Sequence, residues 1–352
     1  MSTLKSAFSI SAVNLLFCFF TFLKFSANFS SLGFSWFVFY LVTLLLKPRN
    51  FQYTNTLTTS RKMKHTLNIF ILLTISHVAI SQNTILWKVT DTINNKKSFI
   101  IGTFHQFGNS FIDSIPEIKE SLLSSDLAVF ESIDKNTSEM MQRRKPSLEI
   151  EKRLKKKDLR KLKVIAKDWK VDLYKLKPWE ISYKLQQEFQ KIKCKTTKPT
   201  DKFDDFDDYL QHIAEENKIE VLGLETDSLQ VSLIEKENKN PRWKKERKNI
   251  SVWINQMTTD KPNMNICWLA NKYRKFDLEY EFEKECEIDI LNLQRNNEWM
   301  KIIPNLLRKQ NIFIAVGFFH LRKKCGILEQ LKEQGFKIEP IKIKPVANTV
   351  YN

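Results

Sequence analysis

Two histidines end the same short motif, Gly-x-x-His, and an apolar run precedes the motif both times. The two copies run from Gly102 to His105 and from Gly317 to His320. The whole chain has only five histidines and seven glycines, so the repeated pairing of these two residue types is informative. An imidazole directly after a strand would present a titratable, metal-binding nitrogen at the edge of a sheet. The glycine would remove a side chain where the backbone turns tightly or approaches a ligand.

Two further apolar runs end on a glutamate, the first on Glu131 and the second on Glu225. In an open α/β sheet, ligands bind outside the carboxyl ends of the strands, so these carboxylates would meet His105 and His320 there. Two imidazoles with carboxylates suit Zn, Mn, Fe or Co better than Mg or Ca. Three protein ligands and one open position would define a catalytic metal site that activates water. The alternative is that each glutamate merely supplies negative charge at the start of the helix that follows it.

Other known catalytic patterns are absent from the sequence. There is no His-Glu-x-x-His, P-loop or Rossmann glycine motif. Ser132 follows the third strand, but it lacks the Gly-x-Ser-x-Gly elbow of a nucleophilic serine. The strand-end histidines and glutamates are therefore the candidate site.

The order of the predicted elements indicates an α/β fold with a mixed, largely parallel central sheet, flanking helices and a long helical middle segment. Because a strand–helix–strand unit of short length forms a right-handed crossover, we expect strand 127–130 to pair with strand 98–103. Glu131 would then lie beside His105. The expected strands are 85–89, 98–103, 127–130, 219–224, 312–316 and 337–343, and the expected helices lie from 116, from 178, at 206–217, within 227–310 and at 327–334.

The first 81 residues are not expected to belong to this fold. Residues 63–81 combine a basic start, a short apolar run and a small-residue cleavage site, which is typical of a secretory signal peptide. Met63 is therefore the expected start, and residues 1–62 would be an over-extended reading frame. The alternative is a membrane anchor made of the apolar stretches 7–23 and 33–46. Residues 82–352 would form the exported domain, periplasmic or secreted.

The net charge of +17 does not by itself indicate a nucleic-acid-binding protein. Basic residues alternate with acidic ones along helical stretches, and no basic motif with aromatic platforms is present, so no nucleic-acid partner is expected. Four cysteines follow the signal peptide: Cys194, Cys267, Cys286 and Cys325. They permit two disulfides in three connectivities, although isolated cysteines are an equal alternative.

These motifs resemble the TraB/PrgY/GumN family, which includes the TIKI-type metalloproteases, over about residues 84–343. The ordered set of motifs is more specific than either Gly-x-x-His alone. The matching segments are Leu86 to Val89, both Gly-x-x-His motifs, residues 125–131, Lys177-Pro178-Trp179, Asp207 to Leu210, residues 223–226, Gln230, Arg295-Asn296, Trp299, Leu321 and Gly326.

The resemblance implies a metal-dependent hydrolase, and in particular a peptidase, with a divalent ion for which Mn or Co is favoured and Zn or Fe is possible. It implies that His105, Glu131 and His320 are the metal ligands. Glu225 would be a fourth ligand or the general base, and Arg295 would bind a carbonyl or carboxylate of a peptide or protein substrate. The alternative is a non-enzymatic protein that sequesters a peptide. Lys323 replaces a glycine common in the family, and we expect it to alter the loop beside His320.

The first prediction concerns the amino terminus. If Met63 is the start and residues 63–81 are removed on export, the native protein begins at Gln82. Mass spectrometry of peptides from the natively expressed protein tests this. Recovery of peptides from residues 2–61 would contradict it.

Overall fold

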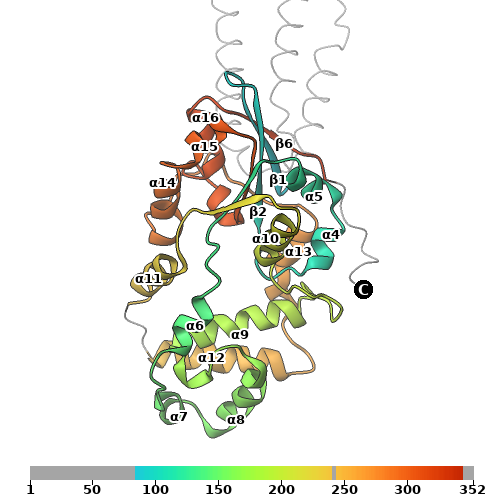
Figure 1. The fold of residues 1–352 in the computed structure, drawn as a ribbon. Helices are drawn as coiled ribbons and strands as arrows, with labels where there is room; N and C mark the ends of the chain where they lie inside the picture. The colour runs from blue at the N-terminus through green and yellow to red at the C-terminus, as the bar shows by residue number, and fades with distance from the viewer. Residues whose placement is uncertain (1–83, 240–242, 344–352) are drawn as a thin grey trace, which may run out of the picture. The chain divides into compact units, whose positions relative to one another are not determined.

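The computed structural model describes residues 84–239 and 243–343 (Figure 1). The predicted signal peptide and the two apolar stretches before it lie outside these residues. None of the helices in the described part of the chain has the length and apolar character that crossing a bilayer requires.

The described residues contain a six-stranded sheet in the order β4-β3-β5-β2-β1-β6. The four strands from β4 to β2 are parallel, and β1 runs antiparallel to both β2 and β6. The predicted mixed, largely parallel sheet is therefore confirmed. The strands are β1 (Leu86–Asp91), β2 (Lys96–Thr103), β3 (Leu127–Phe130), β4 (Glu220–Gly223), β5 (Ile312–Gly317) and β6 (Lys337–Pro340).

The predicted pairing of β2 with β3 is wrong, because β5 lies between them. Phe313 of β5 is opposite Phe99 on β2 and opposite Ala128 on β3. β5 is apolar along its length, and the central position buries both of its faces. Since all three strands are parallel, their carboxyl ends still meet at one edge, with the second Gly-x-x-His motif in the middle.

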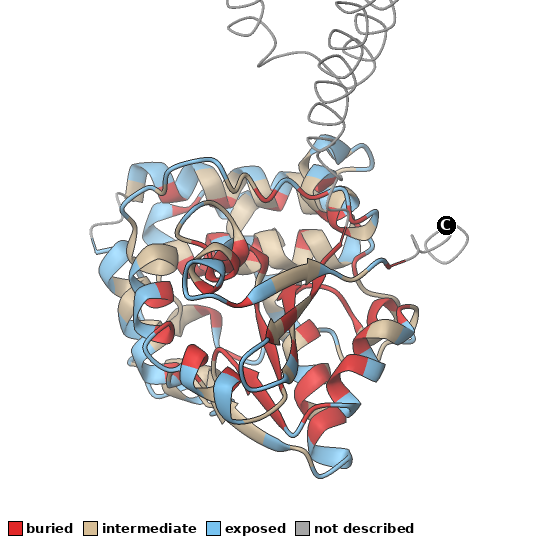
Figure 2. Ribbon diagram, turned by 90° about the horizontal axis from the view of Figure 1, so that it is seen from above, coloured by how far each residue is buried: buried red, intermediate tan, exposed pale blue. Residues whose placement is uncertain are grey.

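Helices pack on both faces of the sheet (Figure 1). In that view α4 (Asn109–Asp113), α5 (Pro116–Leu123), α10 (Phe206–Glu216) and α13 (Trp268–Arg274) lie on one side. α14 (Arg295–Trp299), α15 (Ile303–Lys309) and α16 (Ile327–Glu333) lie on the other. The buried residues gather in the strands and on the helix faces that cover them (Figure 2).

Local sequence signals explain where several helices begin and end. Pro116 begins α5, at the position where a missing backbone N–H costs least. The Asp205 carboxylate caps α10 by accepting from two backbone N–H groups. Gly335, with φ +87, follows the end of α16.

A set of helices from the middle of the chain, the helical unit, has its own apolar core. It consists of α7 (Glu149–Arg153), α8 (Lys156–Ile165), α9 (Pro178–Ile192) and α12 (Trp243–Thr258). The short helix α6 (Thr137–Gln142) precedes them in the chain and has no buried residue. α9 connects the two cores, because Leu185 belongs to the core of the unit and Phe189 to that of the sheet. The predicted helical middle is confirmed.

The remaining elements are one helix, α11 (Asp227–Glu237), and several short turns of helix. The turns are η2 (Ala166–Asp168), η3 (Leu173–Lys175), η4 (Met264–Cys267), the π-helical turn η5 (Ile290–Gln294) and the 3-10 turn η6 (Phe318–Leu321).

All four cysteines of this domain form disulfides. Cys194 is bonded to Cys267, and Cys286 is bonded to Cys325. The structure thus selects one of the three connectivities that the sequence left open. The bonds close loops of 73 and 39 residues, so loop-closure entropy assigns each about 4 kcal/mol of stabilisation.

The loop after His320 contains the predicted departure from the family. Lys323 has φ +64, a left-handed conformation that favours glycine. Its backbone N–H donates to the Tyr280 carbonyl, which holds the residue in this conformation. The loop therefore keeps the shape that a glycine would favour, at the expense of backbone strain.

The second prediction follows from that strain. Lys323→Gly should raise the free energy of unfolding by about 1 kcal/mol, because it relieves a left-handed side-chain penalty. Chemical denaturation measures the change. Lys324→Gly is the matched control, since Lys324 is next in sequence and does not have a positive φ. A stability gain in the control, or none in Lys323→Gly, would show that the backbone conformation is not strained.

Candidate functional site

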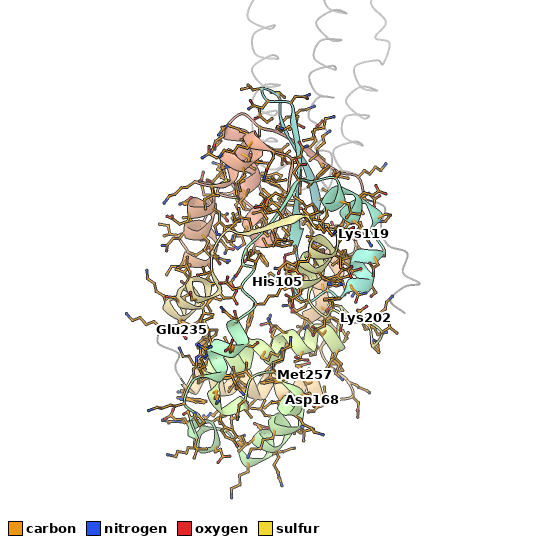
Figure 3. The ribbon with its side chains drawn as sticks, in the orientation of Figure 1. His105, Lys119, Asp168, Lys202, Glu235 and Met257 are labelled. Carbon is orange, nitrogen blue, oxygen red and sulfur yellow. A yellow bond between two sulfur atoms is a disulfide. The ribbon has the colours of Figure 1, made fainter. Side chains whose placement is uncertain are left out.

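The five predicted site residues lie together at the carboxyl edge of the parallel strands. His105 follows β2 and lies between the sheet and the helical unit (Figure 3). Glu131 follows β3, Glu225 follows β4, and His320 lies in η6 directly after β5. Arg295 reaches them from the first residue of α14.

All three predicted metal ligands face the side of Gly317 that lacks a side chain. A Cβ at this position would lie 3.2 Å from Glu131 Oε1, 3.6 Å from His320 Cδ2 and 3.8 Å from His105 Nε2. The Gly317 N–H also donates to Glu131 Oε1 at 2.7 Å. Close approach of the ligands therefore favours a glycine here, and an unusual φ does not, since φ is −54.

A different contact explains why the first motif also has a glycine. A Cβ on Gly102 would lie 2.9 Å from Leu321 Cδ1 and 3.2 Å from Phe318 Cα. Both contacts belong to η6, the turn that carries His320. Gly102 thus allows the second motif to pack directly on the strand of the first.

His105 is the solvent-facing histidine of the pair. Its side chain is 42% exposed, against 6% for His320. Its Nδ1 forms a short contact with Asp207 Oδ2, which also accepts from the Thr103 hydroxyl at 3.1 Å. This contact leaves Nε2 directed toward Gly317. Burial would lower the pKa of His105, but the Asp207 charge outweighs it and raises the pKa above the usual value.

His320 is the buried histidine, and Asn296 determines which of its nitrogens carries hydrogen. His320 Nδ1 lies 2.7 Å from Asn296 Oδ1. Its Nε2 lies 3.1 Å from Arg295 Nη1, which can only donate. Nε2 is therefore the unprotonated nitrogen. Burial lowers the pKa of His320 to about 4, so the ring is neutral at physiological pH.

Arg295 is the centre of a buried ion-pair network. Nη2 donates to Glu131 Oε2 and to Glu225 Oε1, each at 2.6 Å, and Nε donates to Glu225 Oε2 at 3.1 Å. The guanidinium also lies over the Trp299 ring, 4.6 Å from its centroid. All of these charged side chains are less than one-tenth exposed, so each charge depends on its partners.

The two glutamates differ in their hydrogen-bond partners and in the direction of their pKa shifts. Glu131 touches Gly317, Arg295 and, through Gln230 Nε2 at 3.2 Å, helix α11. Burial opposes its ionisation, but His320 and Arg295 prevail and lower the pKa of Glu131 to about 2. The two carboxylate oxygens of Glu225 instead bond to Arg295, and burial raises the pKa of Glu225.

The donor groups present are of the type that binds a divalent cation. Among the described residues, however, the donor atoms that lie within 4.8 Å of one another in a group of three are those of His105, Asp205 and Asp207, and not those of the three predicted metal ligands. Two carboxylates face one guanidinium, and Asp207 lies behind His105, so the site has an excess of negative charge. The unprotonated His320 Nε2 is a suitable donor. A metal at this nitrogen would replace the hydrogen bond from Arg295.

Sequence reasoning missed three residues of the site: Asp207, Gln230 and Asn296. Each lies in a segment that matches the family, but the pattern gave none of them a role. Asp207 is also one of the group His105, Asp205 and Asp207, whose ligand atoms lie within 4.8 Å of one another in the described part of the chain. The Asp205–Asp208 run begins α10, so its sequence signal is that of a helix N-terminus.

The third prediction uses the two glycines as a pair. Gly317→Ala should lower the affinity for a divalent metal at least about tenfold, because the methyl group fills the space between the ligands. Its stability should change little, since alanine tolerates this φ. Gly102→Ala should instead destabilise the fold by about 1–3 kcal/mol through overpacking. Isothermal titration calorimetry with Mn²⁺ and chemical denaturation measure the two effects. Wild-type metal affinity in Gly317→Ala would place the metal elsewhere.

Comparison with known proteins identifies the family. A search of curated proteins and a search of solved structures each found no match to this chain. A family profile, described as the TraB/PrgY/gumN family, matches residues 85–340, from the first strand to the last. The matched region contains all six strands and every residue of the site described above. The chain therefore belongs to the TraB/PrgY/gumN family.

Proposed function

We propose that this protein is a metal-dependent hydrolase that acts on peptides. One observation carries the proposal: His105 Nε2, Glu131 Oε1 and the His320 ring surround the unoccupied side of Gly317. Two imidazoles and a carboxylate are a common ligand set for a catalytic transition metal.

His105, Glu131 and His320 would hold the metal. Mn or Co is favoured by the resemblance to TIKI-type proteins, and Zn or Fe would suit the same donors. The metal would supply an activated water at neutral pH and polarise the carbonyl that is attacked.

The remaining residues would position the substrate and move a proton. Arg295 would donate to the substrate carbonyl or carboxylate with the Nη1–H that is hydrogen-bonded to His320 in this structure. Glu225 is the candidate base, and its raised pKa suits a group that must accept a proton. Asp207 would keep the His105 ring in place.

Export is part of the proposal. The two disulfides are typical of an oxidising compartment, which agrees with the signal peptide predicted at residues 63–81. The protein would act in the periplasm or outside the cell. Its substrate would be a peptide or protein rather than a nucleic acid.

A peptide-sequestering protein is the second candidate, and one observation favours it. Arg295 donates hydrogen bonds to Glu131, Glu225 and His320, so these site residues are already paired with one another. A binding protein would need no more than this preformed network. Chelation separates the two functions: a peptidase loses activity and regains it with Mn²⁺ or Co²⁺, whereas a binder retains its peptide.

The fourth prediction assigns the ligands. In protein beginning at Gln82, His105→Ala and His320→Ala should each lose metal and peptide cleavage while remaining folded. Metal analysis, a peptide-library cleavage assay and circular dichroism measure these outcomes. His212→Ala is the matched control, because His212 is a half-exposed histidine paired with Glu216. Wild-type metal stoichiometry in either site variant would show that its histidine is not a ligand.

The same measurements of metal content and peptide cleavage distinguish the roles of the two glutamates. Glu131→Gln should abolish metal binding, since it removes a ligand. Glu225→Gln should retain at least part of the metal but strongly lower turnover, because an amide cannot accept a proton. The reverse pattern would exchange the two roles.

A further inference from the structure

The His320 ring lies in a segment that does not hold it by itself. η6 is a single 3-10 turn, and the chain after it is extended at Arg322 and left-handed at Lys323. Gly326 then folds against the start of this loop, where a Cβ would lie 2.5 Å from the Leu321 carbonyl oxygen. The orientation of the ring must therefore be set by contacts from outside residues 320–326, the His320 loop.

Asn296 makes those contacts with both ends of the His320 loop. Its Nδ2 donates to the His320 carbonyl at 3.0 Å and to the Cys325 carbonyl at 2.9 Å. Two carbonyl acceptors require the amide nitrogen at this place, so Oδ1 must face His320 Nδ1. An amide oxygen only accepts, and Nδ1 must consequently carry the hydrogen. The side chain is 1% exposed, so water does not compete for these bonds.

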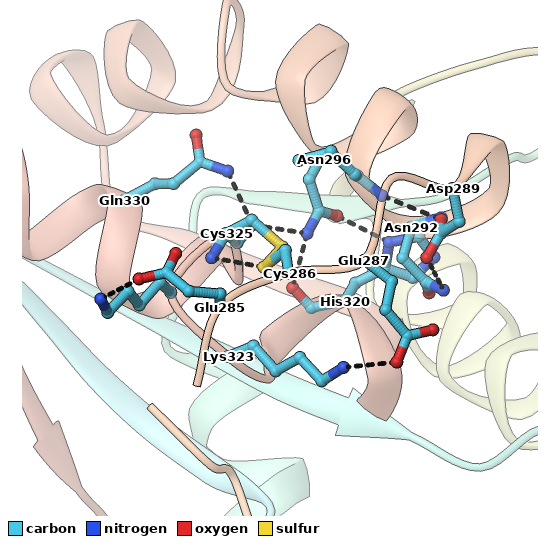
Figure 4. Close-up of a disulfide and its surroundings, with 12 residues drawn as sticks. Glu285, Cys286, Glu287, Asp289, Asn292, Asn296, His320, Lys323, Cys325 and Gln330 are labelled. Atoms are coloured by element: carbon cyan, nitrogen blue, oxygen red, sulfur yellow. Dashed lines mark hydrogen bonds and ion pairs between the residues drawn. A yellow bond between two sulfur atoms is a disulfide. The ribbon is translucent and has the colours of Figure 1, made fainter. Parts of the chain in front are cut away.

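The Cys286–Cys325 disulfide holds the far end of the His320 loop (Figure 4). The Cys325 carbonyl accepts from Asn296 Nδ2 and also from Gln330 Nε2 at 2.7 Å. The Cys325 N–H donates to Cys286 Sγ at 2.9 Å. A covalent bond thus fixes the carbonyl that orients the Asn296 amide.

We propose that Asn296 is the positioning residue for His320. The Cys286–Cys325 disulfide holds the Cys325 carbonyl in place, and this carbonyl orients the Asn296 amide. Together they select the Nδ1–H tautomer and direct the Nε2 lone pair at the site. The consequence for metal binding rests on the proposed function, but the tautomer itself is a property of the metal-free protein.

The second disulfide provides a matched control. Cys194–Cys267 links the end of α9 to η4, and the Cys194 carbonyl accepts from Arg274. Removing either bond takes one loop constraint from the same domain. Only the Cys286–Cys325 bond is connected to Asn296.

The experiment uses protein beginning at Gln82, which keeps three of the five histidines: His105, His212 and His320. Nitrogen-15 NMR of the metal-free protein reports which ring nitrogen of His320 is protonated. Calorimetry with Mn²⁺ reports affinity. The variants are Asn296→Ala, the double change Cys286→Ser and Cys325→Ser, and the control double change Cys194→Ser and Cys267→Ser.

In wild type we expect His320 to be protonated at Nδ1. Asn296→Ala should give a mixture of tautomers and lower Mn²⁺ affinity about 10–100-fold. The Cys286–Cys325 double variant should shift both readouts in the same direction. The Cys194–Cys267 double variant should lower the unfolding midpoint but leave both readouts at the wild-type value.

Three results would overturn the proposal: an unchanged His320 tautomer in Asn296→Ala, an unchanged tautomer in the Cys286–Cys325 variant, or equal shifts in the two cysteine variants. If Asn296→Ala does not fold, the cysteine pairs decide the matter. Wild-type protein that binds no Mn²⁺ would refute the proposed metal site. The tautomer measurement would still decide the role of Asn296.

Discussion

The buried pairing of Arg295 with two glutamates is the interaction on which the site depends. Glu131 and Glu225 follow adjacent parallel strands, so their carboxylates would repel each other if they were both ionised and unpaired. The guanidinium bonds to both and also reaches His320. Because removal of one partner leaves an uncompensated buried charge, a network of this kind is weak evidence for stability and better evidence for a functional site.

The two Gly-x-x-His motifs look alike in sequence but act differently in the folded chain. The first gives a half-exposed histidine whose ring is held by the Asp207 carboxylate. The second gives a buried, neutral histidine held by a side-chain amide. The glycines differ too: Gly102 makes room for η6, while Gly317 makes room for the ligands. An asymmetric pair of this kind presents one donor to solvent and one to the interior.

The loop around His320 combines three constraints within a few residues. These are the left-handed backbone of Lys323, the close packing of Gly326 against the Leu321 carbonyl and the disulfide at Cys325. Each removes conformational freedom from the chain next to the ring. Orientation of a ligand depends on its supporting contacts as much as on its own position, so these constraints belong to the site.

The sequence by itself determined the elements of the fold and the types of residue in the site. Periodic apolar runs predicted all six strands within a few residues, and the segments that follow the four parallel strands identified His105, Glu131, Glu225 and His320. Local patterns suffice here, because strand propensity and strand-end chemistry are properties of short segments. The four cysteines likewise showed that two disulfides were possible, but the sequence left three pairings open.

Tertiary structure alone decided which neighbours these residues have. β5 enters between β2 and β3 from the far end of the chain, and no local pattern records that insertion. Arg295, Asn296 and Asp207 reach the histidines from segments 24 to 102 residues away. Asp207 in particular looks like a helix N-terminal charge and becomes a partner of His105 only when the start of α10 reaches the end of β2. Hydrogen-bond partners, tautomers and pKa values follow from such long-range packing, because they depend on atoms that the sequence places far apart.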